Sequence, residues 1–508
     1  MKYISLIIVL AFAVGCTKLD PKMYSDLTTS NAYSTESDIT AALTGVYADL
    51  APFPGDGWMY YNGYLIMTTD YTTDMGFSTA AGDPTKMSNF TYDANNLYIT
   101  NNWRYMYQVI SNANMLLSKI DAVTMDETKK AQIAGQARFL RALAYRDLTD
   151  AWGPVPLIVD VVNPTETENM PLAPVTEIDK QIIEDLKYGI DKLPPSWSVS
   201  DGLSRATKGA AATLLGQVYM RAHDYTNAKI YIDMVLDMRN QGVYTLNSDF
   251  KKVWSESNKF DKGMIFCILH EPALNGGEIA NHFGPVDHPV VTDRWQYYAV
   301  SLEFWRKYND QDPRKQFFYY NYEGRDARDE TTDHGYFYKM PDPGETVPPS
   351  DTTVLMENVA TMKYSYEMTD QSYYDGRTIP VLRIEDVILC KAEIENELSG
   401  PSAALPFLNE IRARAGAPVY GSAGFPVPGS KGDMAQKILD ERGFELVFEY
   451  KRRPDLIRFG KYESTCNEYM ESRGLGSPVK SSMIHLPYPL VDAQLNSFMA
   501  TENLTRLP

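Results

Sequence analysis

The sequence predicts an all-α, mainly helical protein. Three observations carry this prediction: helical spacing of apolar residues, tetratricopeptide-like offsets in two segments, and loop composition in a few long stretches. Over residues 131–152 the apolar side chains recur every three or four positions, which is one face of a helix, and Gly153 and Pro154 end it. Residues 103–120 and 177–193 predict two further helices. We therefore expect a helical scaffold with few short strands.

Two segments indicate helix pairs that pack closely. In residues 206–238 apolar and small residues fall at the offsets of a tetratricopeptide repeat: Leu215, Gly216, Tyr219, Ala228 and Ile232. Residues 387–415 repeat the pattern through Ala392 and Ala404. Because a continuous core usually needs more than two such units, we expect neighbouring helices to complete it.

Three long segments are predicted to be loops. Residues 52–98, 270–298 and 341–353 are rich in Gly, Pro or aromatic residues. Long loops in a compact domain are more often functional than idle, so we expect the binding site among them.

The first residues predict a lipoprotein signal. Lys2 supplies a positive charge, residues 4–14 are apolar, and Gly15 precedes Cys16. This apolar run is shorter than the roughly 20 residues that span a bilayer, so we interpret it as a cleaved signal peptide. Residues 1–15 would be removed and Cys16 would carry the lipid, palmitate included. A plain secretory signal without a lipid is the alternative.

The mature chain, residues 16–508, is expected to form one binding protein with three parts. These are an N-terminal helical part with the tetratricopeptide-like hairpins, a loop-rich insert and a C-terminal helical part: residues 16–240, 241–380 and 381–508.

Charge and cysteine content exclude several classes of partner. The net charge of -18 repels phosphate backbones, so no nucleic-acid partner is expected, and it favours a neutral or cationic ligand. Cys267, Cys390 and Cys466 are widely spaced, without the paired spacing of a zinc site. We expect small buried hydrophobic residues, with a disulfide from Cys466 to either of the others as the alternative. No cofactor or metal site is predicted, while a structural calcium ion stays open.

Candidate catalytic groups are sparse. His282 and His288 lie in a predicted loop without helical zinc spacing, so we expect them to be exposed. Asp70 and Asp74 are the carboxylate pair to consider, since glycoside hydrolysis uses two carboxyl groups about 5–9 Å apart. Thr72 lies between them, and we favour a capping or turn role over catalysis. A surface glycosidase using this pair is the enzyme alternative.

Aromatic residues give the positive signal. The chain contains 35 Tyr and 7 Trp, many of them in predicted loops. A flat amphipathic ring can stack on the C–H face of a sugar while its polar atom finds a partner. We interpret Trp295 as the best ligand-binding candidate. The other candidates are Tyr298, Tyr92, Phe77 and Asp74.

Several longer segments carry a family resemblance. Three segments follow Cys16: NNWRYMYQVISNANMLLSKI at residues 101–120, GQARFLRALAYRDLTDAWGPVPLIV at 135–159 and ILDERGFELVFEYKRRPDLIRFG at 438–460. Their order is the one found in the SusD/RagB family of outer-membrane nutrient-binding lipoproteins. The chain resembles that family along nearly its whole length. It departs from the pattern at Tyr488, where the family usually has Ile.

The last of these segments contains regularly spaced acids. Glu441, Glu445 and Glu449 lie four residues apart, and Arg442, Arg452 and Arg458 lie beside them. We interpret the segment as a charge-laced helix that holds the C-terminal part together.

The resemblance implies a non-catalytic protein with four tetratricopeptide-like helix pairs. Such a protein would sit as a lid on a SusC-like TonB-dependent outer-membrane transporter, anchored by its N-terminal lipid and facing the cell exterior. Its ligand would be a nutrient, expected to be an oligo- or polysaccharide, held by variable loops. A peptide-binding lid of the same transporter class is the alternative.

Overall fold

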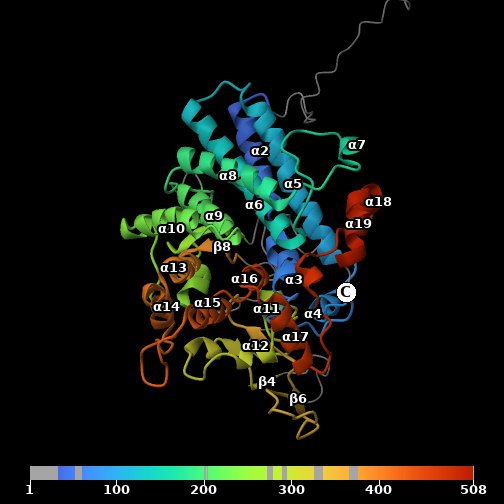
Figure 1. Cartoon of the computed structure of the whole chain (residues 1–508), viewed down its shortest axis with the longest axis vertical. Helices are drawn as coiled ribbons and strands as arrows, with labels where there is room; N and C mark the ends of the chain where they lie inside the picture. Colours follow the sequence, from blue (N-terminus) through green and yellow to red (C-terminus); the bar gives the residue numbers. More distant parts are fainter. Residues whose placement is uncertain are drawn as a thin grey trace, which may run out of the picture.

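Long helices build most of the computed structural model, which describes residues 33–51, 60–198, 202, 204–271, 279–288, 295–324, 336–364 and 376–506. Figure 1 shows them stacked in its upper and middle part, with β8 among them and β4 and β6 at the lower end. The long helices are α2 (Glu36–Ala48), α5 (Leu97–Ile120), α6 (Glu127–Trp152), α8 (Val175–Lys192), α9 (Lys208–Arg221), α10 (Tyr225–Asn240), α13 (Ile384–Ser399), α14 (Pro401–Ala415), α15 (Lys431–Glu445), α17 (Tyr462–Ser472) and α19 (Ser497–Arg506).

Helix α6 lies at the centre of the N-terminal half. The Asp126 side chain accepts a hydrogen bond from the Lys129 backbone N–H and caps its start. The helix ends at Gly153, whose φ of 70° lies in the region that favours glycine. Nearly every residue from Ile133 onward is buried, because α5 and α8 pack against α6. The prediction of a helix over 131–152 is confirmed, although the helix begins four residues earlier.

The helix pairs pack closely because small residues lie at their contacts. A Cβ atom on Gly216 of α9 would meet the Ile232 side chain of α10 at 2.8 Å. Helices α8, α9, α10, α13 and α14 pack on one another in chain order and carry the core from the first half into the second. The expected scaffold of tetratricopeptide-like helix pairs is confirmed.

Short elements fill the remaining described chain. The helices are η1 (Tyr60–Tyr64), α3 (Leu65–Thr69), α4 (Asp83–Ser88), α7 (Pro164–Thr167), η3 (Lys252–Trp254), η4 (Glu256–Asn258), α11 (Ile279–Phe283), α12 (Leu302–Arg306), η5 (Pro313–Gln316), α16 (Arg452–Arg458), η6 (Ser481–Ile484) and α18 (Leu490–Leu495). The strands are β1 (Met264–Ile268), β2 (Ala299–Ser301), β3 (Phe318–Tyr319), β4 (Tyr322–Glu323), β5 (Phe337–Lys339), β6 (Thr353–Leu355), β7 (Asn358–Thr361) and β8 (Ile379–Arg383).

The strands form three small sheets. β1 pairs antiparallel with β8, which places Met264 opposite Arg383. The other sheets have the orders β2-β7-β3 and β4-β5-β6. The expectation of few short strands is therefore confirmed, while the division at residues 240 and 380 stays a prediction.

A buried charge network holds the C-terminal half to the loop-rich region. Its cations are Arg314, Lys363, Arg383, Arg412 and Arg414, and its carboxylates are Asp312, Glu385, Glu441, Glu445 and Glu449. Arg383 donates to both carboxylate oxygens of Glu449 at 2.5 and 2.9 Å and to Glu445 at 2.8 Å. The surrounding cations hold the pKa of Glu445 well below its usual range. The glutamates are structural, as expected, but the expected partners are wrong: Arg442 pairs with Asp386 and Asp455, and Arg452 pairs with Asp74. The single charge-laced helix is wrong as well, because α15 ends at Glu445 and Glu449 lies beyond it.

Some local expectations were wrong. Residues 52–98 were expected to be a loop, yet their described part contains η1, α3, α4 and the start of α5. His282 was expected to be exposed, but it lies buried on α11, while His288 is half-buried. Both errors arise because helices of about five residues are too short to show a period.

The three described cysteines are buried and unbridged: Cys267, Cys390 and Cys466. Burial raises the pKa of the Cys267 thiol to about 12. They are small core residues, and the alternative of a disulfide from Cys466 is wrong. Within the described ranges no helix has both the length and the apolar character needed to cross a membrane.

Candidate functional site

Trp295 is an exposed ring on a firmly held segment. Its side chain is 41% exposed, and its indole stands edge-on to His282 with ring centroids 4.9 Å apart. Three backbone N–H groups tie residues 295–298 to α11 and the residue after it. Trp295 donates to Asn281, Gln296 to Gly284 and Tyr298 to His282, at 2.8–2.9 Å. An exposed aromatic ring with a fixed backbone can bind a ligand without first being ordered.

Tyr297 lies beside Trp295 and is half-buried. Its hydroxyl hydrogen-bonds the Tyr98 hydroxyl, and its carbonyl accepts from the Tyr71 hydroxyl at 2.9 Å. Burial raises the pKa of Tyr297 to about 12, so its hydroxyl stays protonated and able to donate at neutral pH.

A second group of half-buried rings continues this surface. Tyr322 and Tyr338 stack with centroids 4.8 Å apart and an interplanar angle of 11°. The Tyr338 hydroxyl donates to Asp287, and His288 stands edge-on to Tyr319 at 5.2 Å. These rings come from β3, β4, β5 and the turn after α11.

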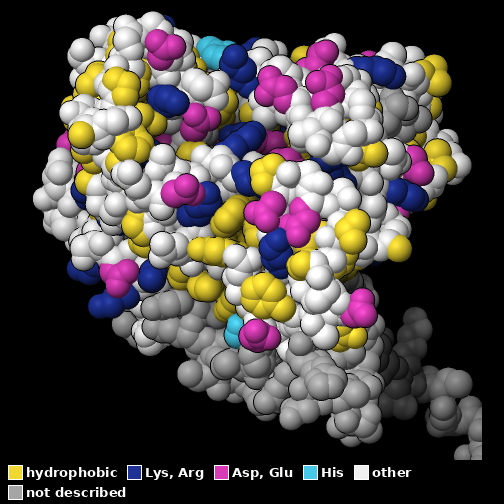
Figure 2. All heavy atoms as spheres, turned by 90° about the horizontal axis from the view of Figure 1, so that it is seen from below, with side chains coloured by type: hydrophobic (Ala, Val, Ile, Leu, Met, Phe, Trp, Pro, Cys, Tyr) yellow, Lys and Arg dark blue, Asp and Glu magenta, His cyan; other side chains and the backbone are white. Residues whose placement is uncertain are grey.

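Gln296 connects the two groups of rings. Its side-chain oxygen accepts from the Val286 N–H at 3.1 Å, and its amide nitrogen donates to Asn358 at 2.7 Å. We call the combined set the aromatic surface: His288, Trp295, Tyr297, Tyr319, Tyr322 and Tyr338. Figure 2 looks at the end of the molecule that carries β4 and β6 and shows hydrophobic side chains grouped between charged ones. Such a surface can stack on apolar ring faces while Asp287 and Gln296 offer hydrogen bonds.

The other residues predicted as ligand contacts lie inside the protein. Tyr298 and Tyr92 are almost completely buried, and Tyr298 packs on Phe283 with centroids 5.0 Å apart. Phe77 is covered by the Arg473 guanidinium, which lies 3.9 Å from its ring centre. In this conformation these rings contribute to the core, and Trp295 is the predicted aromatic residue that reaches the surface.

Asp74 belongs to a buried ion pair. Arg452 donates to both of its carboxylate oxygens at 2.8 and 2.9 Å, and Lys307 donates to one of them at 2.7 Å. Although burial works against the charged form, these cations hold the pKa of Asp74 well below its usual range. A carboxylate fixed in this way joins α16 and α12 to the segment after α3.

Asp70 is also fully buried, but its partners are backbone groups. The N–H groups of Tyr450 and Arg452 donate to it at 3.2 and 3.3 Å. Burial raises the pKa of Asp70 to about 7 in spite of these hydrogen bonds. Neither Asp70 nor Asp74 is open to a substrate in this conformation, so their geometry supports the structural role that the sequence favoured.

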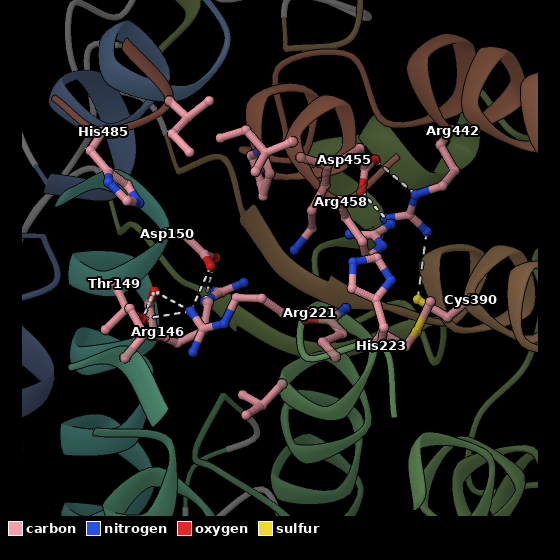
Figure 3. A pocket seen from close by; sticks show the side chains of 18 residues that line it. Arg146, Thr149, Asp150, Arg221, His223, Cys390, Arg442, Asp455, Arg458 and His485 are labelled. Carbon is pink, nitrogen blue, oxygen red and sulfur yellow. Dashed lines mark hydrogen bonds and ion pairs between the residues drawn. The ribbon is translucent and has the colours of Figure 1, made fainter. Parts of the chain in front are cut away.

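A separate cavity of about 240 Å³ lies within the helical scaffold. Its walls carry two Arg-Asp-Arg groups, Arg146–Asp150–Arg221 and Arg442–Asp455–Arg458 (Figure 3). Gln217 crosses from α9 to α13 and donates to Asp386 at 2.8 Å. His485 also lines the cavity, and burial lowers its pKa to about 4, so the ring is neutral at pH 7. Because carboxylates already engage the guanidinium groups, we interpret this cavity as part of the scaffold.

The described residues contain no group of three or more His, Cys, Asp or Glu side chains placed to hold a metal ion. The sequence did not single out the other members of the candidate site, which are Tyr297, Tyr319, Tyr322, Tyr338, His288 and Asp287. The sequence contained one sign of them, since Tyr319 and Tyr322 lie close together in the chain. Alternate side chains of a short strand point to opposite faces, so closely spaced tyrosines there need not all face the core.

A stack of helix pairs that presents a rigid aromatic surface on loop-rich segments defines a helical-repeat binding scaffold. Two family models match the chain. Residues 19–220 match a SusD-like model described as starch-binding and associating with the outer membrane, and residues 251–481 match the SusD family model. The chain belongs to the SusD/RagB family.

Curated relatives extend over most of the chain. SusD-like protein P2 of Formosa agariphila is 26% identical over 90% of each chain. A SusD-like protein of Bacteroides ovatus is 24% identical over 71% of this chain and 65% of its own.

Solved structures share the fold. Surface glycan-binding protein A from Bacteroides thetaiotaomicron, in complex with laminarihexaose, matches with a TM-score of 0.72, 20% identity and coverage of 92% of this chain and 99% of its own. A laminarin-binding SusD-like protein matches with a TM-score of 0.69 and 23% identity, over 91% of this chain and 98% of its own.

Proposed function

We propose that the protein is a lipid-anchored surface protein that binds a glycan without altering it and delivers it to a SusC-like TonB-dependent transporter. The observation that carries the proposal is the exposed, backbone-fixed ring of Trp295 within the aromatic surface. Relatives of the same fold are described as binding laminarin or laminarihexaose, which supports a carbohydrate ligand.

Ring stacking suits a neutral sugar better than a charged ligand here. Two polar side chains, Asp287 and Gln296, lie beside the rings. Hydrogen bonds within the protein already hold both in position. A sugar presents apolar C–H faces together with hydroxyl groups that both donate and accept, so it can satisfy rings and polar atoms together. A cationic peptide would gain from the net charge of -18, which makes it the alternative ligand.

The proposed anchor is the lipid on Cys16, which lies outside the described residues. Association with the outer membrane agrees with the description of the matching family model. Mass spectrometry of the mature N-terminus tests this part of the proposal: a diacylated or triacylated Cys16 is the expected result. An unmodified N-terminus would contradict it.

Titration calorimetry with laminarihexaose and a panel of neutral oligosaccharides tests the binding site. We expect Trp295→Ala to weaken binding at least tenfold, Trp295→Phe to retain most of it, and Phe260→Ala to leave it unchanged. Phe260 is 49% exposed and lies outside the aromatic surface, so it matches Trp295 in exposure. Equal affinities for the wild type and Trp295→Ala would contradict the assigned site, and binding of cationic peptides alone would contradict the ligand class.

A reducing-sugar assay on the same oligosaccharides tests whether binding is non-catalytic. We expect no release above a protein-free control from either the wild type or Asp74→Asn. Turnover by the wild type that Asp74→Asn abolishes would instead support a glycosidase.

A further inference from the structure

The C-terminal helices expose an unusual number of large apolar side chains. In α18, α19 and their junction these are Val491, Leu495, Phe498 and Leu504, which are 64%, 57%, 48% and 83% exposed. The Leu490 N–H donates to the Ala94 carbonyl at 2.9 Å, which brings α18 beside the exposed Leu97 at the start of α5. We call this set the C-terminal apolar surface: Leu97, Leu490, Val491, Leu495, Phe498 and Leu504. Figure 1 shows α18 and α19 at the right edge of the molecule, beside α5.

These helices are fixed to the protein by buried polar anchors. Arg506, which is 3% exposed, donates to the Trp152 carbonyl at 2.7 Å. Asn503 both donates to the Tyr488 carbonyl and accepts from the Tyr488 N–H, at 2.9 and 2.7 Å. Asn496 donates to the Met170 carbonyl at 2.8 Å. The apolar side chains are therefore held outward by a defined backbone and do not belong to a frayed end.

Helix α19 reverses the usual amphipathic arrangement. Its buried face consists of Met499, Asn503 and Arg506, while Phe498 and Leu504 point to solvent. A surface helix normally buries its apolar residues, and contiguous exposed apolar patches on soluble proteins mark interaction sites. This surface also contains a groove of about 460 Å³, whose lining includes Asn169, Leu490, Leu495 and Asn503.

The rim of the C-terminal apolar surface is acidic. Asp492 is half-buried and Glu502 is exposed on the helices themselves, and Glu502 pairs with the buried Arg506 at 3.2 Å. Exposed Glu166 and Glu168 lie on the turn whose Asn169 N–H donates to the Leu495 carbonyl at 3.3 Å. An acidic rim repels both anionic lipid and a second copy of the same surface, and it attracts a basic one.

We propose that the C-terminal apolar surface docks a protein whose matching face is apolar at its centre and basic at its rim. The inference rests on the proposed function, because the transporter is the partner that would carry this face. It assigns to α18 and α19 the role of holding the lid to its partner, while the aromatic surface holds the cargo.

Affinity purification of the tagged full-length protein from detergent-solubilised cells tests the assignment, with the TonB-dependent barrel identified by mass spectrometry. The variant is Leu495→Glu/Phe498→Glu/Leu504→Glu, and the matched control is Ile230→Glu/Phe260→Glu, which alters residues of similar exposure elsewhere. We expect the variant to recover at least tenfold less barrel than the wild type and the control to recover as much as the wild type. Circular dichroism and oligosaccharide affinity should stay unchanged in both, because all five positions are exposed.

The outcomes separate the two proposals. If the wild type recovers no barrel, the proposed partner itself is wrong. If the wild type and the variant recover equal amounts, the partner stands and the assigned surface is wrong. A wild-type dimer in light scattering that the variant loses, or flotation with phosphatidylglycerol vesicles that the variant loses, would assign the surface to self-association or to lipid and overturn the inference.

Discussion

The buried charge network and the aromatic surface are both made of residue types that look functional in a sequence. The structure buries and pairs the first set, whereas it leaves part of the second exposed. In the network, as many carboxylates as cations are buried and paired, as with Arg383 between Glu445 and Glu449. In the aromatic surface, Trp295 remains exposed while only its backbone is fixed. The difference teaches that exposure combined with a fixed backbone identifies a candidate binding residue better than residue type does.

The largest expected effect comes from breaking the charge network. Arg383→Met removes the partner of two buried carboxylates, and leaving buried charges unpaired costs about 3–5 kcal/mol. Denaturant unfolding should show this loss. The surface pair of Lys339 and Glu345 provides the control: Lys339→Met should change the free energy of unfolding far less, because water screens a surface ion pair. Equal effects of the two substitutions would mean that the network does not stabilise the fold.

Trp295 and Tyr298 lie three residues apart in the loop-rich region and allow an exposed ring to be compared with a buried one. Tyr298 is fully buried and Trp295 is exposed, so we expect Tyr298→Ala to lower the free energy of unfolding by about 3–5 kcal/mol. Trp295→Ala should change it by less than about 1 kcal/mol while it weakens ligand binding. Thermal and denaturant unfolding of both variants measure this. A similar loss of stability in both would place Trp295 in the core.

The buried carboxyl of Asp70 predicts a pH dependence with a defined sign. Its pKa of about 7 in the folded protein is above the ordinary value of 3.8, so the folded state binds the proton more tightly. Stability should therefore fall as pH rises from about 4 to about 7, by up to about 4 kcal/mol, since one pKa unit corresponds to about 1.4 kcal/mol.

Asp70→Asn should remove this contribution to the pH dependence. Unfolding free energies at pH 5 and pH 8 provide the measurement. From pH 5 to pH 8 the unfolding free energy of Asp70→Asn should rise relative to that of the wild type. The exposed control Asp237→Asn should show no such change. A difference that stays constant with pH would mean that the carboxyl does not titrate in this range.

The smallest effects compare two helical glycines. A Cβ atom on Gly216 would lie 2.8 Å from Ile232, so Gly216→Ala should destabilise by about 1–3 kcal/mol. Gly45 in α2 has no atom within 4 Å of such a Cβ, and Gly45→Ala should stabilise by about 0.5–1 kcal/mol. Opposite signs in denaturant unfolding are expected, and a stabilising Gly216→Ala would contradict the close packing of α9 and α10.

The scaffold was predictable because its signals are local. The apolar period of residues 131–152, with Gly153 after it, predicted α6, and the small residues Gly216 and Ala228 predicted a close helix pair. Helix ends and packing contacts of this kind depend on residues a few positions apart, which a single sequence displays.

The candidate site was predictable only in part. Trp295 was proposed from its place in a loop-like segment and is exposed, but the same reasoning selected Tyr92 and Tyr298, which the structure buries. Composition cannot separate a core ring from a surface ring, because that choice depends on contacts such as Tyr298 with Phe283, which are supplied by distant or irregular segments. His282 was misjudged for the same reason: the short helix α11 has no period to reveal its buried side.

The pairing of β1 with β8 has a consequence for how such a protein can diversify. Met264 and Arg383 are partners in register, so more than a hundred residues of chain depart from the scaffold and return to it at the same place. Segments of another length or composition can be inserted between these two points without changing the spacing of α10 and α13, provided that the network residues they carry, such as Arg314 and Lys363, are kept. The β1–β8 ladder fixes both ends of the loop-rich region, so one helical framework can carry different binding surfaces.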